Sequence, residues 1–362
     1  MTERKAFKRR VRAQMERTGQ GYAQAAAQLE AGNPARRADT HPASAVVVAL
    51  LRASGLTLDP VTAFGIGGGI GFMYALFRYR DTAHPLLTLV CQHHPDAWAP
   101  AILERLEVEH TAASGKRELA RVLDADRPVI LPVARGAIPW LAPDPLTAGE
   151  EHVVLALPQG EGARIFDGTG AHARLTRTAL VEGYASTRRK HPVVTVADGA
   201  TLPEDLGAAV AAGLRATVSG MTGPVLGNAF DVNFGLSGLR RWAERVAAPG
   251  PDGWGEAFAQ SDVWRTRLTE CITTEHTAPV AGRPLFARLL RQAGHPDAAE
   301  HFDRSARHWR TIAADAERGT LGLDDLAPLV GAIADDEAAG ITALSAALDG
   351  AGASAASAEP GA

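Results

Sequence analysis

The sequence contains very few cysteines and no long apolar run, and each absence excludes a class of protein. Cys91 and Cys271 are the two cysteines among 362 residues, and they lie far apart. Two isolated cysteines form neither a disulfide framework nor the paired ligands of a zinc site, which favours a reducing cytosol. No stretch approaches the ~18 apolar residues of a membrane span, and no apolar segment follows the charged N-terminus as in a secretory signal. We therefore expect a cytoplasmic protein.

The sequence also lacks a large excess of charge of one sign. Its formal net charge is −4 at pH 7, and its isoelectric point is about 6.3. These values argue against nucleic acid as a partner of the chain as a whole. Hydrophobic residues at 46% and charged residues at 22% are typical of a globular protein, and a chain of this length is expected to form two domains.

Residues 1–33 are the exception to this balance, because basic side chains are concentrated there. Phe7, Val11 and Met15 recur at helical spacing, so we expect a basic helical extension. Either this extension docks on the main body of the protein, or it recruits a partner such as an acidic carrier protein or nucleic acid. Residues 32–34, Gly-Asn-Pro, are typical of a linker after it.

Residues 38–197 carry helix patterns first and closely spaced strand patterns after them. The first helix is expected to follow Thr40 as its N-cap, with Pro42 in its first turn and Gly55 after its end. Further helices are expected at residues 98–106 and 116–123, and strands at residues 86–90, 107–111, 128–133, 152–157, 163–166 and 192–196. The strands after residue 128 are joined by turns rather than by helices, which favours an antiparallel sheet and the α+β class.

Residues 198–349 carry helical patterns alone. Helices are expected at residues 206–218, 236–246, 261–272, 283–293, 298–316 and 323–348. Residues 350–362 contain Ala, Ser, Gly, Glu and Pro, which is the composition of a disordered tail. The sequence therefore predicts a helical second domain with a short tail.

The stretch FGIGGGIGF, residues 64–72, holds five glycines among apolar residues. Glycine permits backbone conformations and close approaches that a Cβ forbids. The stretch is therefore either a tight turn packed under the core or the wall of a small-molecule or acyl pocket, to which Gly65, Gly67, Gly68 and Gly69 would contribute. A dinucleotide loop fits poorly, since the spacing is GxGxxxG and no acidic residue closes a strand about 20 residues later.

His152 and Asp167 are the best candidates for chemistry. His152 opens one predicted strand and Asp167 closes the next, so a hairpin between them places the two side chains side by side. A carboxylate beside an imidazole fixes its tautomer and raises its basicity, which is the orienting half of a nucleophilic triad. A hydrogen-bonded pair at a turn is the structural alternative. His93 and His94 follow Cys91, but no second cluster accompanies them, so no metal site is expected.

The chain resembles the family typified by the butirosin biosynthesis acyltransferase over about residues 38–320. The resemblance lies in HPASAVVVALL, in FGIGGGIGF, in EHVVLAL with IFDGTG, and in a helical part with FGLSGLRRWAERV and RPLFARLLRQAG. It implies a papain-like N-terminal domain followed by a helical companion domain. It also implies transfer of an acyl group from a carrier-protein thioester to an amine, with His152 as general base and Asp167 as its orienter.

The nucleophile of that family has no counterpart at its usual position here. Family members typically have a cysteine directly after the histidine at the start of the first helix, whereas in this sequence Pro42 follows His41. A helix N-terminus lowers the pKa of a thiol and offers N–H groups to an oxyanion, and Pro42 supplies neither group. Ser44 and Cys91 are the candidate substitutes, and His41 is expected to belong to the substrate site.

The sequence thus predicts an acyltransferase-like protein of specialised metabolism that acts on an acyl thioester and an amine acceptor, without a cofactor. If it is an enzyme, it is an acyltransferase or a cysteine-peptidase-like hydrolase with a degenerate nucleophile site. Direct attack by the amine, with His152 as base, needs no enzyme nucleophile because a thioester is already activated. The alternatives are a non-catalytic homologue that binds a small ligand or a carrier protein, and a scaffold that recruits a partner through the basic N-terminal helices.

Overall fold

The computed structural model describes residues 40–356, apart from residues 81, 83, 142–147, 188–191, 260 and 276. The chain forms two compact units, Met1–Leu58 with Val108–Leu202 and Asp59–Glu107 with Pro203–Ala362. This division differs from the expected continuous domain of residues 38–197, because residues 59–107 pack with the C-terminal helices. The expected basic helices of residues 1–33 lie outside the described residues.

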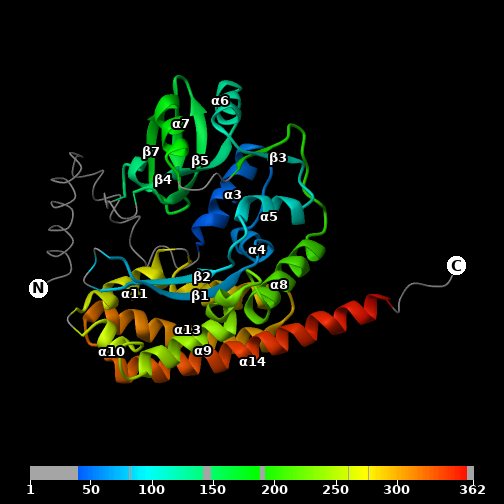
Figure 1. The fold of residues 1–362 in the computed structure, drawn as a ribbon. Coiled ribbons are helices and arrows are strands. Elements are labelled where there is room, and N and C mark those ends of the chain that lie inside the picture. The colour runs from blue at the N-terminus through cyan, green and yellow to red at the C-terminus, as the bar shows by residue number, and fades with distance from the viewer. Residues whose placement is uncertain are drawn as a thin grey trace, which may run out of the picture. The chain divides into compact units, whose positions relative to one another are not determined.

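The first unit contains a six-stranded sheet in the order β3-β8-β4-β5-β6-β7, with antiparallel pairs throughout (Figure 1). Its strands are His110–Ala113 (β3), Val129–Ala134 (β4), Glu151–Gln159 (β5), Gly162–Phe166 (β6), His172–Thr176 (β7) and Val193–Val196 (β8). The strands expected from residue 128 onward are confirmed, β3 begins later than expected, and β7 was not predicted. β7 lies at the edge of the sheet, where its alternating exposed and half-buried residues give no apolar run.

The helices of the first unit are Pro42–Ala53 (α3), Lys116–Asp124 (α6) and Arg177–Ala185 (α7), with a short 3₁₀ turn Arg135–Ala137 (η2). The apolar residues of α6 and α7 form one buried cluster with alternate residues of β4, β5 and β6, as the period of two in a strand requires. α3 contacts β4, β5 and β8. Its N-cap is His41 rather than Thr40, because the His41 side chain accepts a hydrogen bond from the Ser44 N–H.

The second unit contains an antiparallel hairpin and the remaining helices. The hairpin consists of Ile70–Phe77 (β1) and Leu86–Gln92 (β2). The helices are Pro60–Ile66 (α4), Trp98–Arg105 (α5), Gly207–Thr222 (α8), Gly235–Ala247 (α9), Trp254–Ala257 (α10), Val263–Thr273 (α11), Arg283–Gln292 (α12), Pro296–Arg318 (α13) and Leu323–Ala356 (α14), with 3₁₀ turns Ala229–Asn233 (η3) and Val280–Gly282 (η4). α14 continues past residue 350, where the tail was expected to begin. Together the two units confirm an α+β part followed by a helical part.

Aromatic packing explains why the hairpin belongs to the helical unit. In Figure 1, β1 and β2 lie against α9, α11 and α13, and β1 contacts α9 while β2 contacts α11. Phe72 of β1 stacks on Trp242 of α9 at 5.8 Å between ring centroids, and Trp242 stacks on Trp309 of α13 at 5.6 Å. These rings are buried, so the hairpin contributes a large apolar area to the helical core.

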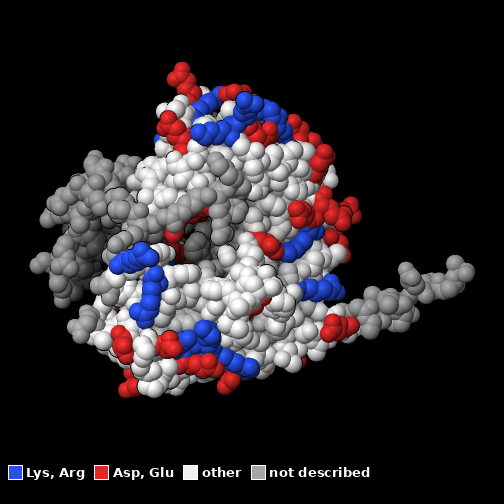
Figure 2. Space-filling model, in the orientation of Figure 1, with Lys and Arg blue, Asp and Glu red and all other residues white. Residues whose placement is uncertain are grey.

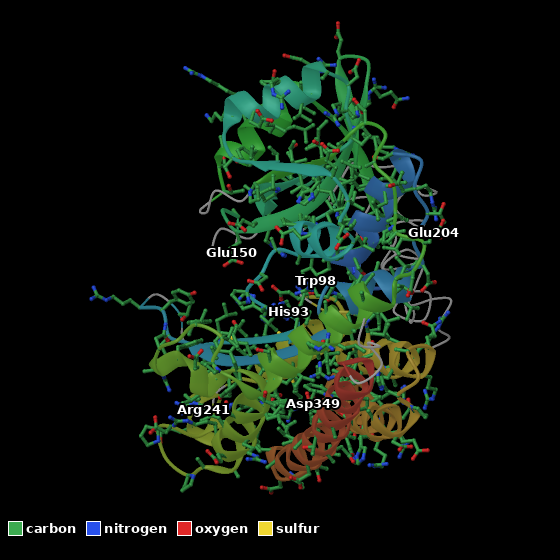
Figure 3. The ribbon with its side chains drawn as sticks, turned by 90° about the vertical axis from the view of Figure 1, so that its right-hand side faces the viewer. His93, Trp98, Glu150, Glu204, Arg241 and Asp349 are labelled. Atoms are coloured by element: carbon green, nitrogen blue, oxygen red, sulfur yellow. The ribbon has the colours of Figure 1, made fainter. Side chains whose placement is uncertain are left out.

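The Gly-rich stretch ends α4 and begins β1, inside the core of the second unit. A Cβ on Gly67 would lie 2.3 Å from the ring of Trp98, and one on Gly68 would lie 2.7 Å from the ring of His93. Gly68 also has a φ of +103°, which favours glycine. Figure 3 labels His93 and Trp98, the two side chains that fill this space. The structure therefore has the tight packed turn that was one of the two expectations for this stretch.

The described helices include none with the length and apolar character to cross a lipid bilayer.

Candidate active site

The hairpin of β5 and β6 brings His152 and Asp167 into contact, as the sequence predicts. Leu155 of β5 pairs with Phe166 of β6, so Asp167 follows at the position next to Val154. His152 and Val154 lie on the same face of β5 because successive strand residues alternate. The Nε2 atom of His152 lies 3.1 Å from Oδ2 of Asp167. Strand register thus places an imidazole and a carboxylate within hydrogen-bonding distance.

The carboxylate of Asp167 accepts hydrogen bonds from Trp140 and Thr169 as well as from His152. Trp140 donates its Nε1–H to Oδ2 at 2.9 Å, and Thr169 donates its backbone N–H and its hydroxyl to Oδ1 at 2.8 and 2.5 Å. Burial raises the pKa of Asp167, but the hydrogen bond and charge of His152 and the two hydrogen bonds from Thr169 outweigh burial, so this pKa lies below its ordinary value. The carboxylate is therefore ionised and fixed at neutral pH.

The orientation of His152 leaves one ring nitrogen for chemistry. Because an ionised carboxylate only accepts hydrogen bonds, Nε2 of His152 carries the proton toward Asp167 and Nδ1 carries the lone pair. The His152 side chain is 20% exposed, whereas that of Asp167 is 1% exposed. The pair therefore combines a buried carboxylate with a half-buried imidazole.

The start of α3 lies directly beside this pair. Gly168, which follows Asp167, has a φ of +81°, and a Cβ there would lie 2.1 Å from the carbonyl oxygen of Pro42. Only glycine fits this approach, so the backbone of Pro42 and the turn after β6 are in contact. Pro42 has neither a thiol nor an N–H group. The helix start that would carry a nucleophile thus meets the His152–Asp167 pair, but the residue there is inert.

The two other predicted residues of α3 contact each other. The Ser44 hydroxyl lies 3.1 Å from Nδ1 of His41 and donates to the His41 carbonyl oxygen at 3.1 Å. The Ser44 N–H also donates to the same Nδ1 at 3.2 Å, and both residues are buried. Within the described part of the chain, Ser44 and His152 share no hydrogen bond. The structure thus places His41 and Ser44 in the helix cap next to the pair.

Cys91 and the predicted glycines lie in the second unit. Cys91 is buried in β2, and desolvation raises the pKa of its thiol to about 12. Gly65, Gly67, Gly68 and Gly69 are buried against neighbouring side chains, among them Leu289 and Phe286. The structure therefore divides the nine predicted site residues into two groups, with His41, Ser44, His152 and Asp167 in one unit and Cys91 and the four glycines in the other. Over the described residues, no group of three or more His, Cys, Asp or Glu side chains could hold a metal ion.

Trp140 and Thr169 are the site residues that sequence reasoning missed. Thr169 follows Asp167 by two residues, so an Asp-Gly-Thr turn with side chain to backbone bonding is a signal that the sequence does contain. Trp140 lies 27 residues before Asp167, outside any regular element, and nothing in its local pattern indicates this contact.

A histidine oriented by a buried carboxylate, beside the start of a helix, is an arrangement suited to acid–base chemistry. Residues 41–167 match the family model for butirosin biosynthesis protein H, N-terminal. The match begins at the helix cap His41 and ends at the carboxylate Asp167, so it contains Trp140 and His152 but neither Gly168 nor Thr169. The match confirms the resemblance to this family over residues 41–167. No curated protein matches the chain.

Proposed function

We propose that the protein transfers an acyl group from a thioester to an amine in specialised metabolism, with His152 as general base and Asp167 as its orienter. The observation that carries this proposal is the 3.1 Å hydrogen bond between the half-buried imidazole of His152 and the buried carboxylate of Asp167. A base of this kind contributes about 100-fold to 10,000-fold to a proton-transfer step. The family match supports a biosynthetic acyl-transfer role.

The reaction requires one proton transfer in each direction. The amine nitrogen attacks the thioester carbonyl carbon, and Nδ1 of His152 takes the proton that the nitrogen loses. The tetrahedral intermediate then breaks its C–S bond, and the leaving sulfur takes the proton back from Nδ1. The products are an amide and a thiol. Asp167 keeps Nε2 protonated throughout, so the ring stays in the tautomer that the attack needs.

Direct attack fits this chain better than a covalent intermediate. Pro42 has no nucleophilic atom at the helix start. The Ser44 hydroxyl is buried in hydrogen bonds with His41. The raised pKa of Cys91 keeps its thiol protonated at neutral pH, and the thiolate is the reactive form. A papain-like scaffold would thus retain its base and orienter while the acceptor amine acts as the nucleophile.

A second function, binding without catalysis, is favoured by the presence of Pro42 where the family has its nucleophile. A homologue that has lost the nucleophile can bind a small ligand or a carrier protein without turnover. In that case the His152–Asp167 pair orders the loop after β6 and does no chemistry. A third function, partner recruitment through basic helices, depends on residues 1–33, which lie outside the described part of the chain.

The experiment measures amide formation and thiol release from an acyl thioester of N-acetylcysteamine with a panel of amines, followed by mass spectrometry and a thiol reagent. The full-length protein is compared with His152→Gln and with the matched control His172→Gln, which changes an exposed histidine of the same unit. We expect a loss of about 100-fold or more for His152→Gln and no loss for His172→Gln.

Equal rates for His152→Gln and the unaltered protein would remove His152 from the reaction. Thiol release without amide would assign hydrolysis rather than transfer. Absence of both products across the panel, with folded protein, would favour the non-catalytic homologue.

A further inference from the structure

Two adjoining open cavities lie on the surface of the second unit, one on each side of Arg241. The first, of about 520 Å³, is bounded by the end of β1, by η3, by α9 and by the loop at residues 251–252. The second, of about 540 Å³, is bounded by the end of α8, by η3 and by α9. Val232 and Arg241 line both cavities, so the two cavities share part of their walls. Figure 3 labels Arg241 on this face of the unit.

Arginine dominates the charge of these cavities. Arg78, Arg241 and Arg245 line the first cavity, and Arg240 and Arg241 line the second. Two acidic residues accompany them, Glu244 and Asp252, and Asp252 already pairs with Arg245 at 3.0 Å. In the described part of the chain, neither Arg240 nor Arg241 forms an ion pair. In Figure 2, basic side chains gather with acidic ones over the region of α9.

The opposite wall of the first cavity is apolar and electrically neutral. Phe77 is 39% exposed and Val232 is 46% exposed, so both side chains offer apolar surface to the cavity. The hydroxyl of Tyr74 accepts a hydrogen bond from Nε1 of Trp254 at 2.8 Å. Burial raises the pKa of Tyr74 to about 12, so the phenol stays uncharged. The cavities therefore present arginine on α9 and uncharged, partly apolar surface on β1 and η3.

We propose that this double cavity, centred on Arg241, binds an organic phosphate that has an apolar body. Guanidinium groups recognise phosphate oxygens through paired hydrogen bonds, and several of them suit a doubly charged anion. The exposed Phe77 and Val232 side chains would be removed from water by contact with an apolar group, which is favourable. Cavities of this size hold small molecules. The site involves none of the residues of the His152 chemistry, so it stands apart from the proposed function.

The test is calorimetric titration of the full-length protein with phenyl phosphate, inorganic phosphate and phenol. Phenyl phosphate combines the anion with an apolar ring, and the other two probes carry one half each. We expect phenyl phosphate to bind at least tenfold more tightly than either half. Arg241→Gln should weaken phenyl phosphate at least tenfold, whereas Arg215→Gln, which alters an exposed arginine of α8 away from both cavities, should leave its affinity unchanged.

A second variant tests the same site if the Arg241→Gln protein does not fold. Val232→Asp places a carboxylate in both cavities at a side chain that is already exposed, and it should also weaken phenyl phosphate at least tenfold. The proposal is overturned if phenyl phosphate does not bind, if it binds no better than inorganic phosphate, or if both variants keep the original affinity. His152→Gln should bind phenyl phosphate normally, which separates this site from the proposed function.

Discussion

The His152–Asp167 pair of the first unit and the Arg283–Glu337 pair of the second unit are both hydrogen-bonded pairs of a basic and an acidic side chain, but they differ in exposure. In the first, the base is 20% exposed and the carboxylate 1% exposed. In the second, both side chains are 0% exposed, and Nε and Nη2 of Arg283 each donate to a Glu337 oxygen at 2.8 Å. The same kind of contact is thus open to solvent in one unit and closed in the other.

The closed pair, Arg283 and Glu337, also forms hydrogen bonds with several neighbouring groups. Ser305 and Trp309 donate to Glu337 at 2.7 and 3.0 Å. Arg283 also donates to the backbone carbonyls of Cys91 and Gly71 at 2.8 and 3.1 Å, which ties both strands of the hairpin to α12. The four side chains of this network are buried and bond to one another, so its role is architectural.

The open pair, His152 and Asp167, differs because one ring nitrogen of His152 takes no part in holding the pair together. Every oxygen of Asp167 is occupied, but Nδ1 of His152 is not required by the contacts that hold the pair. The buried carboxylate fixes the ring, and the ring itself is partly exposed. The fully buried pair therefore holds elements of the fold together, whereas the half-buried pair leaves part of an imidazole ring at the surface.

The largest loss of stability is expected when the buried pair of Arg283 and Glu337 is broken. Glu337→Gln leaves the buried charge of Arg283 without its counter-ion, and such a loss typically costs about 3–5 kcal/mol in the free energy of unfolding. Asp336→Asn is the matched control, because Asp336 is the neighbouring residue and pairs with the half-exposed Arg304, for which at most about 1 kcal/mol is expected. Urea unfolding followed by circular dichroism measures both. Equal losses in the two variants would show that burial does not distinguish these pairs.

A smaller effect, with a defined pH dependence, is expected at Asp167. Asp167→Asn removes the charge from four hydrogen bonds, at a cost of about 1–3 kcal/mol at pH 7. The folded-state pKa of Asp167 is lowered, so its contribution is present above the unfolded-state pKa of about 3.9 and is lost as the pH falls through the folded-state value.

The difference in unfolding free energy between Asp167→Asn and the unaltered protein should therefore shrink on acidification below about pH 4. Asp198→Asn, which alters a 97% exposed carboxylate of the same unit, should show almost no difference at any pH. If the difference in unfolding free energy between Asp167→Asn and the unaltered protein stayed constant from pH 7 to pH 3, it would contradict the ionised, hydrogen-bonded state of this carboxylate.

The smallest effect is expected at Cys91. Its thiol has a pKa raised to about 12 and lies in the core of the second unit, so iodoacetamide should not label it in the native protein at pH 7.5. In urea the same thiol should label fully, which is the positive control, and peptide mass spectrometry separates Cys91 from Cys271. Rapid labelling of Cys91 in the folded protein would restore it as a candidate nucleophile.

Sequence reasoning succeeded where the signal is local. The apolar runs of β4, β5 and β6 and the short separation of His152 and Asp167 were enough to predict the strands and the contact between the two side chains. The helix that begins at Pro42 was also predicted, with a cap one residue away from the observed His41. Each of these features depends on residues that are neighbours in the chain or across one hairpin.

The features that were missed depend on contacts between distant residues. The Gly-rich stretch was expected to be part of the unit that holds His152, but its glycines pack against Trp98, His93 and helices of the second unit. Arg283 and Glu337 are 54 residues apart, and no local pattern pairs them. Trp140 likewise reaches Asp167 from a segment without regular structure. Tertiary packing decides such contacts, and a single sequence does not record it.

We propose that His152 and Asp167 form a working base beside a helix start that has no nucleophile. The most direct test of this proposal is intact-mass measurement after incubation with an acyl thioester, for the unaltered protein, for Pro42→Cys and for Pro42→Cys with His152→Ala. We expect an acyl adduct on Pro42→Cys, none on the unaltered protein, and a strongly reduced adduct when His152 is also removed. An adduct on the unaltered protein, or an adduct on Pro42→Cys that does not depend on His152, would contradict it.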